Sequence, residues 1–154
     1  MSLKLVKISG LCAIMAAVAY TIGLALLLSV GEIPEPDDMR SFLLFVNAHR
    51  NNLISSLWVL GMFTTLKLGV LPGIYRLLRS EAALVCVALV ACVVGFLFGT
   101  LFLSGFLSIG YELAPIYGAS GEDAQPALEA IGATLWSSGV LLRSLSHFFF
   151  WGVG

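Results

Sequence analysis

Three ionisable side chains, Lys67, Arg143 and His147, lie inside long apolar stretches of this 154-residue chain. On insertion scales, a charged group near the centre of a membrane-spanning helix costs about 2.5–3.5 kcal/mol, so each residue is a candidate for function. No acidic residue is expected at the depth of Lys67 and Arg143 on any neighbouring helix. Two cations at similar depth therefore predict a site for an anion, such as a lipid phosphate or a carboxylate.

These residues also have a second interpretation. The aliphatic stem of Lys67 is long enough to carry its ammonium group to the nearer membrane surface. For Arg143 both interpretations stay open, because the serines around it make this stretch unusually polar. His147 follows one helical turn after Arg143, so the two side chains share a helix face. The candidate ligand-binding residues are Arg143, Lys67, His147 and Ser144.

The sequence completes no catalytic or metal-binding pattern: it has no HExxH motif and no Cys/His cluster. The cysteines (Cys12, Cys86 and Cys92) lie in apolar runs without a CxxC pair, and we interpret them as small helix residues. His49 and His147 are expected near opposite membrane surfaces, which excludes a bis-histidine haem within one chain. We therefore predict no catalytic residue, metal or cofactor, while a haem or pigment held between chains stays open.

The composition indicates lipid rather than water around most of the surface. Hydrophobic residues make up 59% of the chain and charged residues 11%, where a soluble domain has about 25% charged residues. The mean hydropathy is +1.00. The net charge is −1 and no basic run follows a phosphate backbone, so nucleic acid is not an expected partner.

Four long apolar runs must position the candidate residues. The longest, 82–111, has no Asp, Glu, Lys, Arg or His; as a helix it would measure about 45 Å, against roughly 30 Å for the hydrocarbon core of a bilayer. The predicted fold class is therefore all-α: one domain, residues 1–154, forming an integral membrane four-helix bundle. The spans are expected at about 8–30, 53–75, 82–110 and 130–151.

A short amphipathic helix is predicted between the first two spans, at about 38–49. Its apolar residues recur at helical spacing, and Asp37 or Asp38 can cap its start. We expect it to lie in the membrane interface with its apolar face in lipid. Arg50, which follows it, is expected on lipid headgroups, and residues 111–125 are expected to form a polar loop.

Pro72 lies inside the second predicted span, where it should kink or end the helix. The basic residues near span ends predict the orientation through the positive-inside rule. They place both termini in the cytoplasm, with the chain in the cell membrane. Lys4, Lys7, Arg76 and Arg79 lie at one end of the bundle, and Arg40 and Arg50 lie at the other.

Small residues predict close helix contacts. Gly95 and Gly99 form a GxxxG motif in the third span, and Ala13 and Ala17 begin a small face on the first. These faces could dock other membrane protein subunits or a second copy of the chain. At the C-terminal end, either Trp151 alone anchors the last span or the chain is the front part of a longer protein.

Three stretches resemble uncharacterised bacterial multi-span proteins, which are often predicted with about six helices. These are the span end 71–79 (LPGIYRLLR), the long Gly-rich third span and the Glu-led start of the fourth span at 128–139. The resemblance covers about 53–154. It implies no activity and no site residue, and it favours a longer protein.

Three functions follow, in this order. The first is a non-catalytic accessory subunit or assembly factor of a larger membrane complex. The second is a small oligomeric transporter or channel for an anionic solute or lipid, acting through Arg143 and Lys67. The third is a lipid-acting membrane enzyme, for which only His147, Arg143 and Glu129 could serve, without a complete catalytic geometry.

Overall fold

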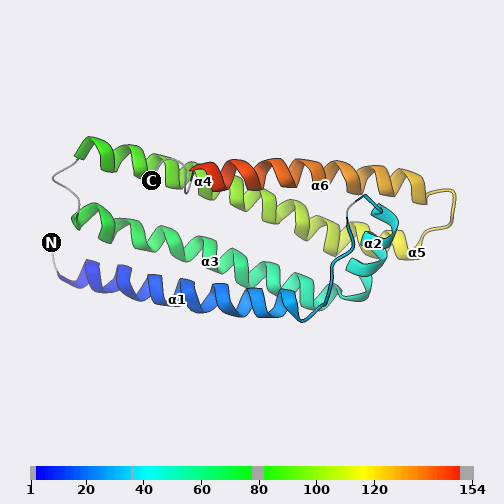
Figure 1. Ribbon diagram of the computed structural model, residues 1–154, viewed down its shortest axis with the longest axis horizontal. Helices are drawn as coiled ribbons and strands as arrows, with labels where there is room; N and C mark the ends of the chain where they lie inside the picture. The colour runs from blue at the N-terminus through cyan, green and yellow to red at the C-terminus, as the bar shows by residue number, and fades with distance from the viewer. Residues whose placement is uncertain (1–2, 36, 78–81, 150–154) are drawn as a thin grey trace.

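The computed structural model describes residues 3–35, 37–77 and 82–149, and these form an all-helical arrangement (Figure 1). The predicted all-α class is confirmed. In chain order the elements are α1 (Leu3–Leu28), α2 (Met39–Ala48), α3 (Arg50–Leu77), α4 (Ala82–Ser108), the π-helix η2 (Ile109–Leu113), α5 (Ala114–Ala119) and α6 (Gln125–His147).

Within this part of the chain, three helices are long and apolar enough to cross a membrane: Lys4–Leu28, Arg50–Leu77 and Val85–Ala119. They coincide with the first three predicted spans. The fourth predicted span coincides with α6, a helix of 23 residues that is not among the three. Its predicted end at Trp151 lies outside the described residues, as does Arg79.

The long helices run side by side in the spatial order α1, α3, α4, α6 (Figure 1). α1 packs along α3, α6 packs along α4 in the opposite direction, and α3 meets α4. α1 and α6 make no extended contact with each other. The bundle is therefore two tightly packed pairs joined on one side.

Close approach of α1 and α3 depends on small residues. A Cβ added to Gly73 would lie 2.6 Å from Ser9 Cβ, and one added to Gly69 would lie 2.6 Å from Cys12 Sγ. Real Cβ atoms do not approach other atoms this closely, so a larger residue would separate the helices. Small residues thus let α1 and α3 approach each other, but on α1 they are Ser9 and Cys12 rather than the predicted Ala13 and Ala17. Ala13 and Ala17 are both exposed.

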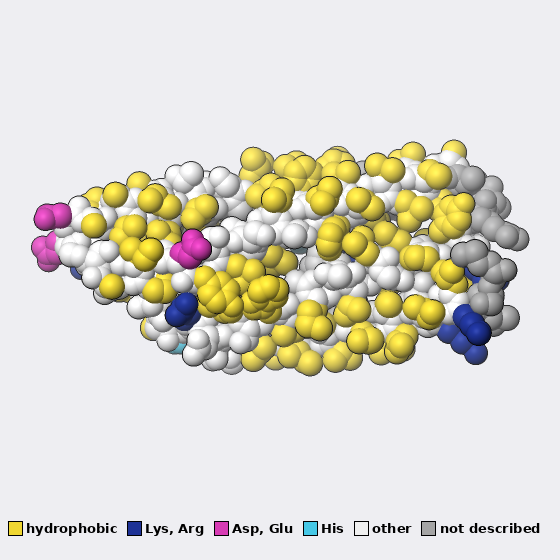
Figure 2. Space-filling model, turned by 180° about the vertical axis from the view of Figure 1, so that it is seen from behind, with side chains coloured by type: hydrophobic (Ala, Val, Ile, Leu, Met, Phe, Trp, Pro, Cys, Tyr) yellow, Lys and Arg dark blue, Asp and Glu magenta, His cyan; other side chains and the backbone are white. Residues whose placement is uncertain are grey.

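Opposite charges gather at the two ends of the molecule, and apolar side chains cover the middle (Figure 2). The basic end carries Lys4, Lys7 and Arg76. The other end, here called the acidic end, also holds Arg40 and Arg50. Its acidic residues are Glu32, Glu35, Asp37, Asp38, Glu112, Glu122, Asp123 and Glu129.

The acidic end is closed by a packed layer, here called the cap, which consists of α2, η2 and α5. Asp38 caps α2 by accepting a hydrogen bond from the backbone N–H of Ser41, as the sequence predicted. The predicted apolar face of α2 is also found, but its residues pack on η2 and α5 instead of lipid. The buried residues of the cap are Met39, Phe42, Leu43, Val46, Ile109, Leu113, Ala114 and Tyr117.

The predicted polar loop at 111–125 is wrong for most of its length. The helix of α4 continues through η2 and α5 to Ala119, which leaves only residues 120–124 between α5 and α6. Arg50, expected on lipid headgroups, donates from Nε to the Gly110 carbonyl oxygen at 3.1 Å and from Nη2 to that of Tyr111 at 3.3 Å. Likewise, α3 does not end at Pro72 but continues to Leu77.

Candidate functional site

A cavity of about 690 Å³ lies between the two helix pairs, below the cap. Its walls come from α1, α3, α4, η2 and α6, and α2 covers its acidic end. Leu24 on α1 and Arg143 on α6 both line the cavity and are exposed. Because α1 and α6 do not pack along each other, we place the opening of the cavity between these two helices.

Aromatic rings close the cavity toward the acidic end. Phe42 of α2 meets Trp136 of α6 edge-on, with ring centroids 5.0 Å apart. Phe106 of α4 lies on Trp136 at the same centroid distance. All three rings line the cavity, so this part of the wall suits an apolar chain.

The other part of the wall holds a polar cluster, which we define as Thr64, Lys67, Arg143, Ser146 and His147. The hydroxyl of Ser146 donates to the Gly95 carbonyl oxygen at 2.8 Å, which ties α6 to α4. A Cβ on Gly99 would lie 3.1 Å from Ser146 Oγ and 3.7 Å from Thr64 Cγ2. The absence of a side chain at Gly99 therefore lets α3, α4 and α6 meet at this level.

The polar cluster lies near the middle of the bundle rather than at either end. At roughly 1.5 Å per helical residue, Thr64 lies about 21 Å along α3 from Arg50 and about 18 Å from Arg76. These two arginines mark the acidic and basic ends of the helix. Lys67, one turn farther along α3, lies about 25.5 Å from Arg50 and about 13.5 Å from Arg76, so this cation is nearer the basic end.

The Lys67 side chain is turned into the cavity. Its ammonium nitrogen lies 4.1 Å from the ring centroid of Phe63, which is one turn closer to the acidic end. This position is typical of a cation–π contact. It is also opposite to the direction that snorkelling to the basic end would require, so the structure favours the cavity-facing interpretation for this half-buried lysine.

Arg143 and His147 line the same cavity from α6, as the shared helix face predicted. Ser144 does not line it; the Ser144 hydroxyl is exposed and donates to the Val140 carbonyl oxygen at 3.0 Å. The nearest acidic residue along α6 is Glu129, about 21 Å away at one helical rise per residue. Its carboxylate instead accepts a hydrogen bond of 2.6 Å from the Tyr117 hydroxyl in the cap.

Sequence reasoning missed Thr64, and it counted Ser146 only among the serines that make the stretch around Arg143 polar. Each lies three residues from a predicted cation, Thr64 before Lys67 and Ser146 after Arg143, and this spacing places them on the same helix faces. That spacing was the available signal. A single hydroxyl in an apolar helix carries little weight by itself, because it can satisfy its own helix backbone.

The two histidines, His49 and His147, lie far apart in the structure. His49 lies beside Arg50 at the acidic end, where Nδ1 is 3.1 Å from the Phe45 carbonyl oxygen, while His147 belongs to the polar cluster about 20 Å deeper. Over residues 3–35, 37–77 and 82–149, no group of three or more His, Cys, Asp or Glu side chains could hold a metal ion.

The GxxxG motif serves an interface inside the chain. Gly95 accepts the hydrogen bond from Ser146, and Gly99 leaves room for that same serine, so both glycines pack against α6. Of the predicted packing residues, Ala13 and Ala17 remain on an exposed face of α1. Of the two small-residue faces predicted to dock a partner, the face with Ala13 and Ala17 is the exposed one.

No family model matches this chain, and no curated protein and no solved structure is significantly similar to it. The resemblance to bacterial multi-span proteins therefore stays a prediction, as does the longer protein that it implies. What the cavity binds must be inferred from the side chains that line it.

Proposed function

We propose that this chain is an integral protein of the cell membrane, crossed by α1, α3, α4 and α6, with both termini in the cytoplasm. Three helices of sufficient length and hydropathy support this proposal, and α6 lies beside one of them. The apolar middle and charged ends of the surface fit a bilayer. Lys4, Lys7 and Arg76 gather at one end, which the positive-inside rule assigns to the cytoplasm.

We further propose that the cavity binds an amphiphile with an anionic headgroup and a single apolar chain. One observation carries this proposal: Lys67 and Arg143 lie at one end of a cavity whose remaining wall is apolar and aromatic. The chain would lie against the rings beneath the cap, and the headgroup would meet the cations and hydroxyls of the polar cluster. Entry would be lateral, between α1 and α6.

Size and electrostatics both support this ligand class. A volume of about 690 Å³ falls within the roughly 300–1,000 Å³ of small-molecule pockets. A hydrogen bond to a charged group contributes about 1.5–3 kcal/mol in a protein. Among residues 3–35, 37–77 and 82–149, no ion pair joins Arg143 to an acidic side chain, and an anionic ligand would supply that charge.

Equilibrium binding of radiolabelled lysophosphatidate to the purified full chain tests the proposal. Arg143→Gln should raise Kd by about 10- to 100-fold, the equivalent of one lost hydrogen bond to a charged group. Arg40→Gln is the matched control, because Arg40 is an exposed cation on α2 that does not line the cavity. Equal affinity for both variants, or no binding to the unmodified chain, would contradict the proposal.

The accessory-subunit function remains a prediction with less support than before. Its three motivations were the GxxxG motif, the small face on the first span and the lack of a complete catalytic set, and of these Gly95 and Gly99 pack inside the chain. The exposed face with Ala13 and Ala17 still fits a partner subunit or a second copy. A lipid-acting enzyme gains no support, because Glu129 is engaged with Tyr117 far from His147.

A further inference from the structure

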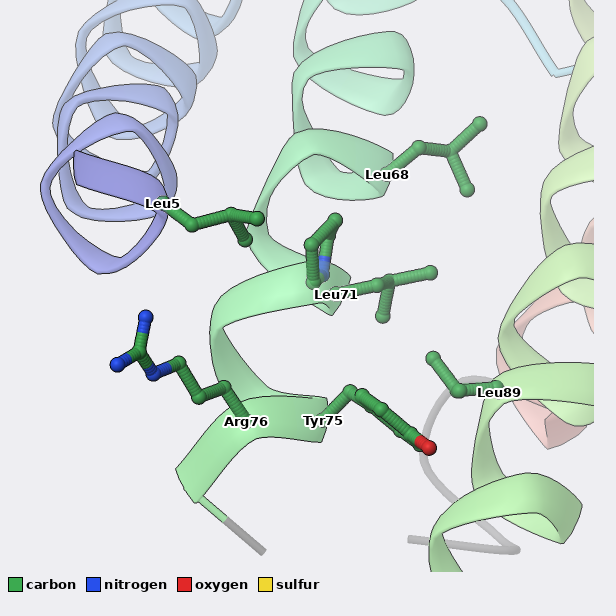
Figure 3. A pocket seen from close by; sticks show the side chains of 7 residues that line it. Leu5, Leu68, Leu71, Tyr75, Arg76 and Leu89 are labelled. Atoms are coloured by element: carbon green, nitrogen blue, oxygen red, sulfur yellow. The ribbon is translucent and has the colours of Figure 1, made fainter. Parts of the chain in front are cut away.

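A second hollow of about 500 Å³ lies near the basic end, here called the basic-end pocket. Figure 3 shows its lining: Leu5 reaches it from α1 and Leu89 from α4, while α3 supplies the remainder. In this view Tyr75 extends toward α4 and Arg76 toward α1. The pocket is therefore apolar inside and has polar groups on two of its sides.

The basic-end pocket and the cavity lie one after the other along the same three helices. On α3 the cavity ends at Lys67, and the pocket begins at the next residue, Leu68. On α4 the pocket uses Leu89 and the cavity begins at Gly99; α1 shows the same division, with Leu5 in the pocket. The two linings are adjacent on α3, at Lys67 and Leu68, whereas ten positions separate them on α4 (Leu89 to Gly99) and fifteen on α1 (Leu5 to Tyr20).

The stretch of α3 at Lys67 and Leu68 is adjacent to a weakened part of the helix. Pro72 has no backbone N–H, so the carbonyl group of Leu68 lacks its usual helical donor. Both residues line the basic-end pocket. Local rearrangement of α3 is therefore cheaper between Leu68 and Pro72 than in an uninterrupted helix, since one hydrogen bond is already missing.

Basic side chains occur at intervals along both spaces. Arg143 and Lys67 lie in the polar cluster, and Arg76 lies about 13.5 Å farther along α3, at the basic-end pocket. An anionic headgroup that leaves the polar cluster would thus find another cation before it reaches the surface. In many transporters the substrate site likewise lies near the bilayer midplane.

We propose that the cavity and the basic-end pocket are two halves of one path, along which the chain moves a single-chain anionic lipid between the leaflets. This inference rests on the proposed function and adds the movement of the bound ligand. The headgroup passes from Arg143 and Lys67 to Arg76, while opening of α3 at Leu68 joins the two spaces. The transfer equilibrates the lipid and needs no energy source.

Transbilayer exchange in proteoliposomes tests this path. The full chain is reconstituted into phosphatidylcholine vesicles with acyl-labelled fluorescent lysophosphatidate, and albumin extracts the probe from the outer leaflet at timed intervals. The unmodified chain should speed the exchange at least about tenfold over protein-free vesicles, a barrier change of ~1.4 kcal/mol. Binding of the same probe is measured in parallel on the solubilised chain.

Leu68→Trp is the decisive variant, because the larger ring would fill the basic-end pocket from a residue that does not line the cavity. It should reduce exchange to nearly the protein-free rate and leave Kd within about twofold, a change of under half a kcal/mol. Leu77→Trp is the matched control: Leu77 lies on the same helix, is 71% exposed and lines neither space. Its exchange should equal that of the unmodified chain.

Each failure has a separate meaning. Tight binding with exchange at the protein-free rate would overturn the path and leave the proposed function intact, whereas absence of binding would overturn both. Full exchange by a folded Leu68→Trp variant would also overturn the path. If that variant does not fold, Arg76→Gln provides the second test: exchange should slow while Kd is kept, and unchanged exchange would contradict the inference.

Discussion

The cap and the cavity are neighbours that share α2 and η2, yet one is filled and the other is hollow. In the cap, Leu43 and Ala114 are 0% exposed and Tyr117 is 1% exposed. Directly beneath it, about 690 Å³ is left open. Protein interiors normally contain few voids larger than a water molecule, and this contrast with the well-packed layer is the reason that we propose a ligand for the cavity.

Aromatic residues also differ in role between the cap and the cavity. In the cap, the Tyr117 hydroxyl is satisfied by Glu129, and no ligand is needed to complete the arrangement. In the cavity, the rings of Phe42 and Trp136 contact each other edge-on, and both rings also line the cavity. We therefore expect changes in the cap to affect stability and changes in the cavity to affect binding.

Leu43→Ala should have the largest effect on stability. It removes a fully buried side chain from the cap, so the free energy of unfolding should fall by about 2–5 kcal/mol. Leu44→Ala is the matched control, because Leu44 is 46% exposed and its truncation should change stability by less than about 0.5 kcal/mol. Denaturant titration in mixed micelles measures both, and equal losses would show that the cap is not the packed region.

Tyr117→Phe should have an intermediate effect. It removes the hydroxyl that donates to Glu129 and leaves the ring in place, so the loss should be about 0.5–1.5 kcal/mol. Binding of lysophosphatidate should stay unchanged, because Tyr117 does not line the cavity. A loss of binding without a loss of stability would break the separation between cap and cavity.

The smallest effect concerns pH. Hydrogen bonds from the Ser41 hydroxyl and backbone N–H hold the pKa of Asp38 below its usual 3.8. A carboxyl group with a lowered pKa stabilises the folded state above pH 3.8, and this contribution is lost as the pH falls through the folded-state value. Ser41→Ala should therefore show a smaller drop in Tm on acidification than the unmodified chain; an identical drop would contradict this assignment.

The sequence predicted helices and their faces better than it predicted what covers those faces. The apolar residues of α2 and its Asp38 cap follow from local periodicity and capping chemistry. Periodicity is the same whether lipid or protein lies opposite, so the packing of α2 on α5 could not be derived. Acidic residues made the stretch 111–125 resemble a polar loop, but Glu112 lies in η2, and Pro115 lies in the first turn of α5, where proline is tolerated.

The sequence pointed to individual residues of the candidate site but not to the cavity that they line. Lys67 and Arg143 stand out because charges inside apolar runs are costly. Nothing in the sequence states that α1 and α6 do not pack along each other, although both line the cavity. Gly95 and Gly99 were predicted to pack against a partner outside the chain, whereas in the structure Gly95 accepts a hydrogen bond from Ser146 on α6.

Photo-crosslinking of the bound lipid tests the central claim most directly. A lysophosphatidate with a diazirine at the end of its acyl chain is irradiated with the full chain in a bilayer, and mass spectrometry locates the adducts. We predict adducts around Phe42 and Trp136, removed by excess unlabelled lysophosphatidate and by Arg143→Gln. Adducts spread over outward residues such as Ile14 and Val90, which are 65% and 64% exposed, and insensitive to competition would contradict the claim.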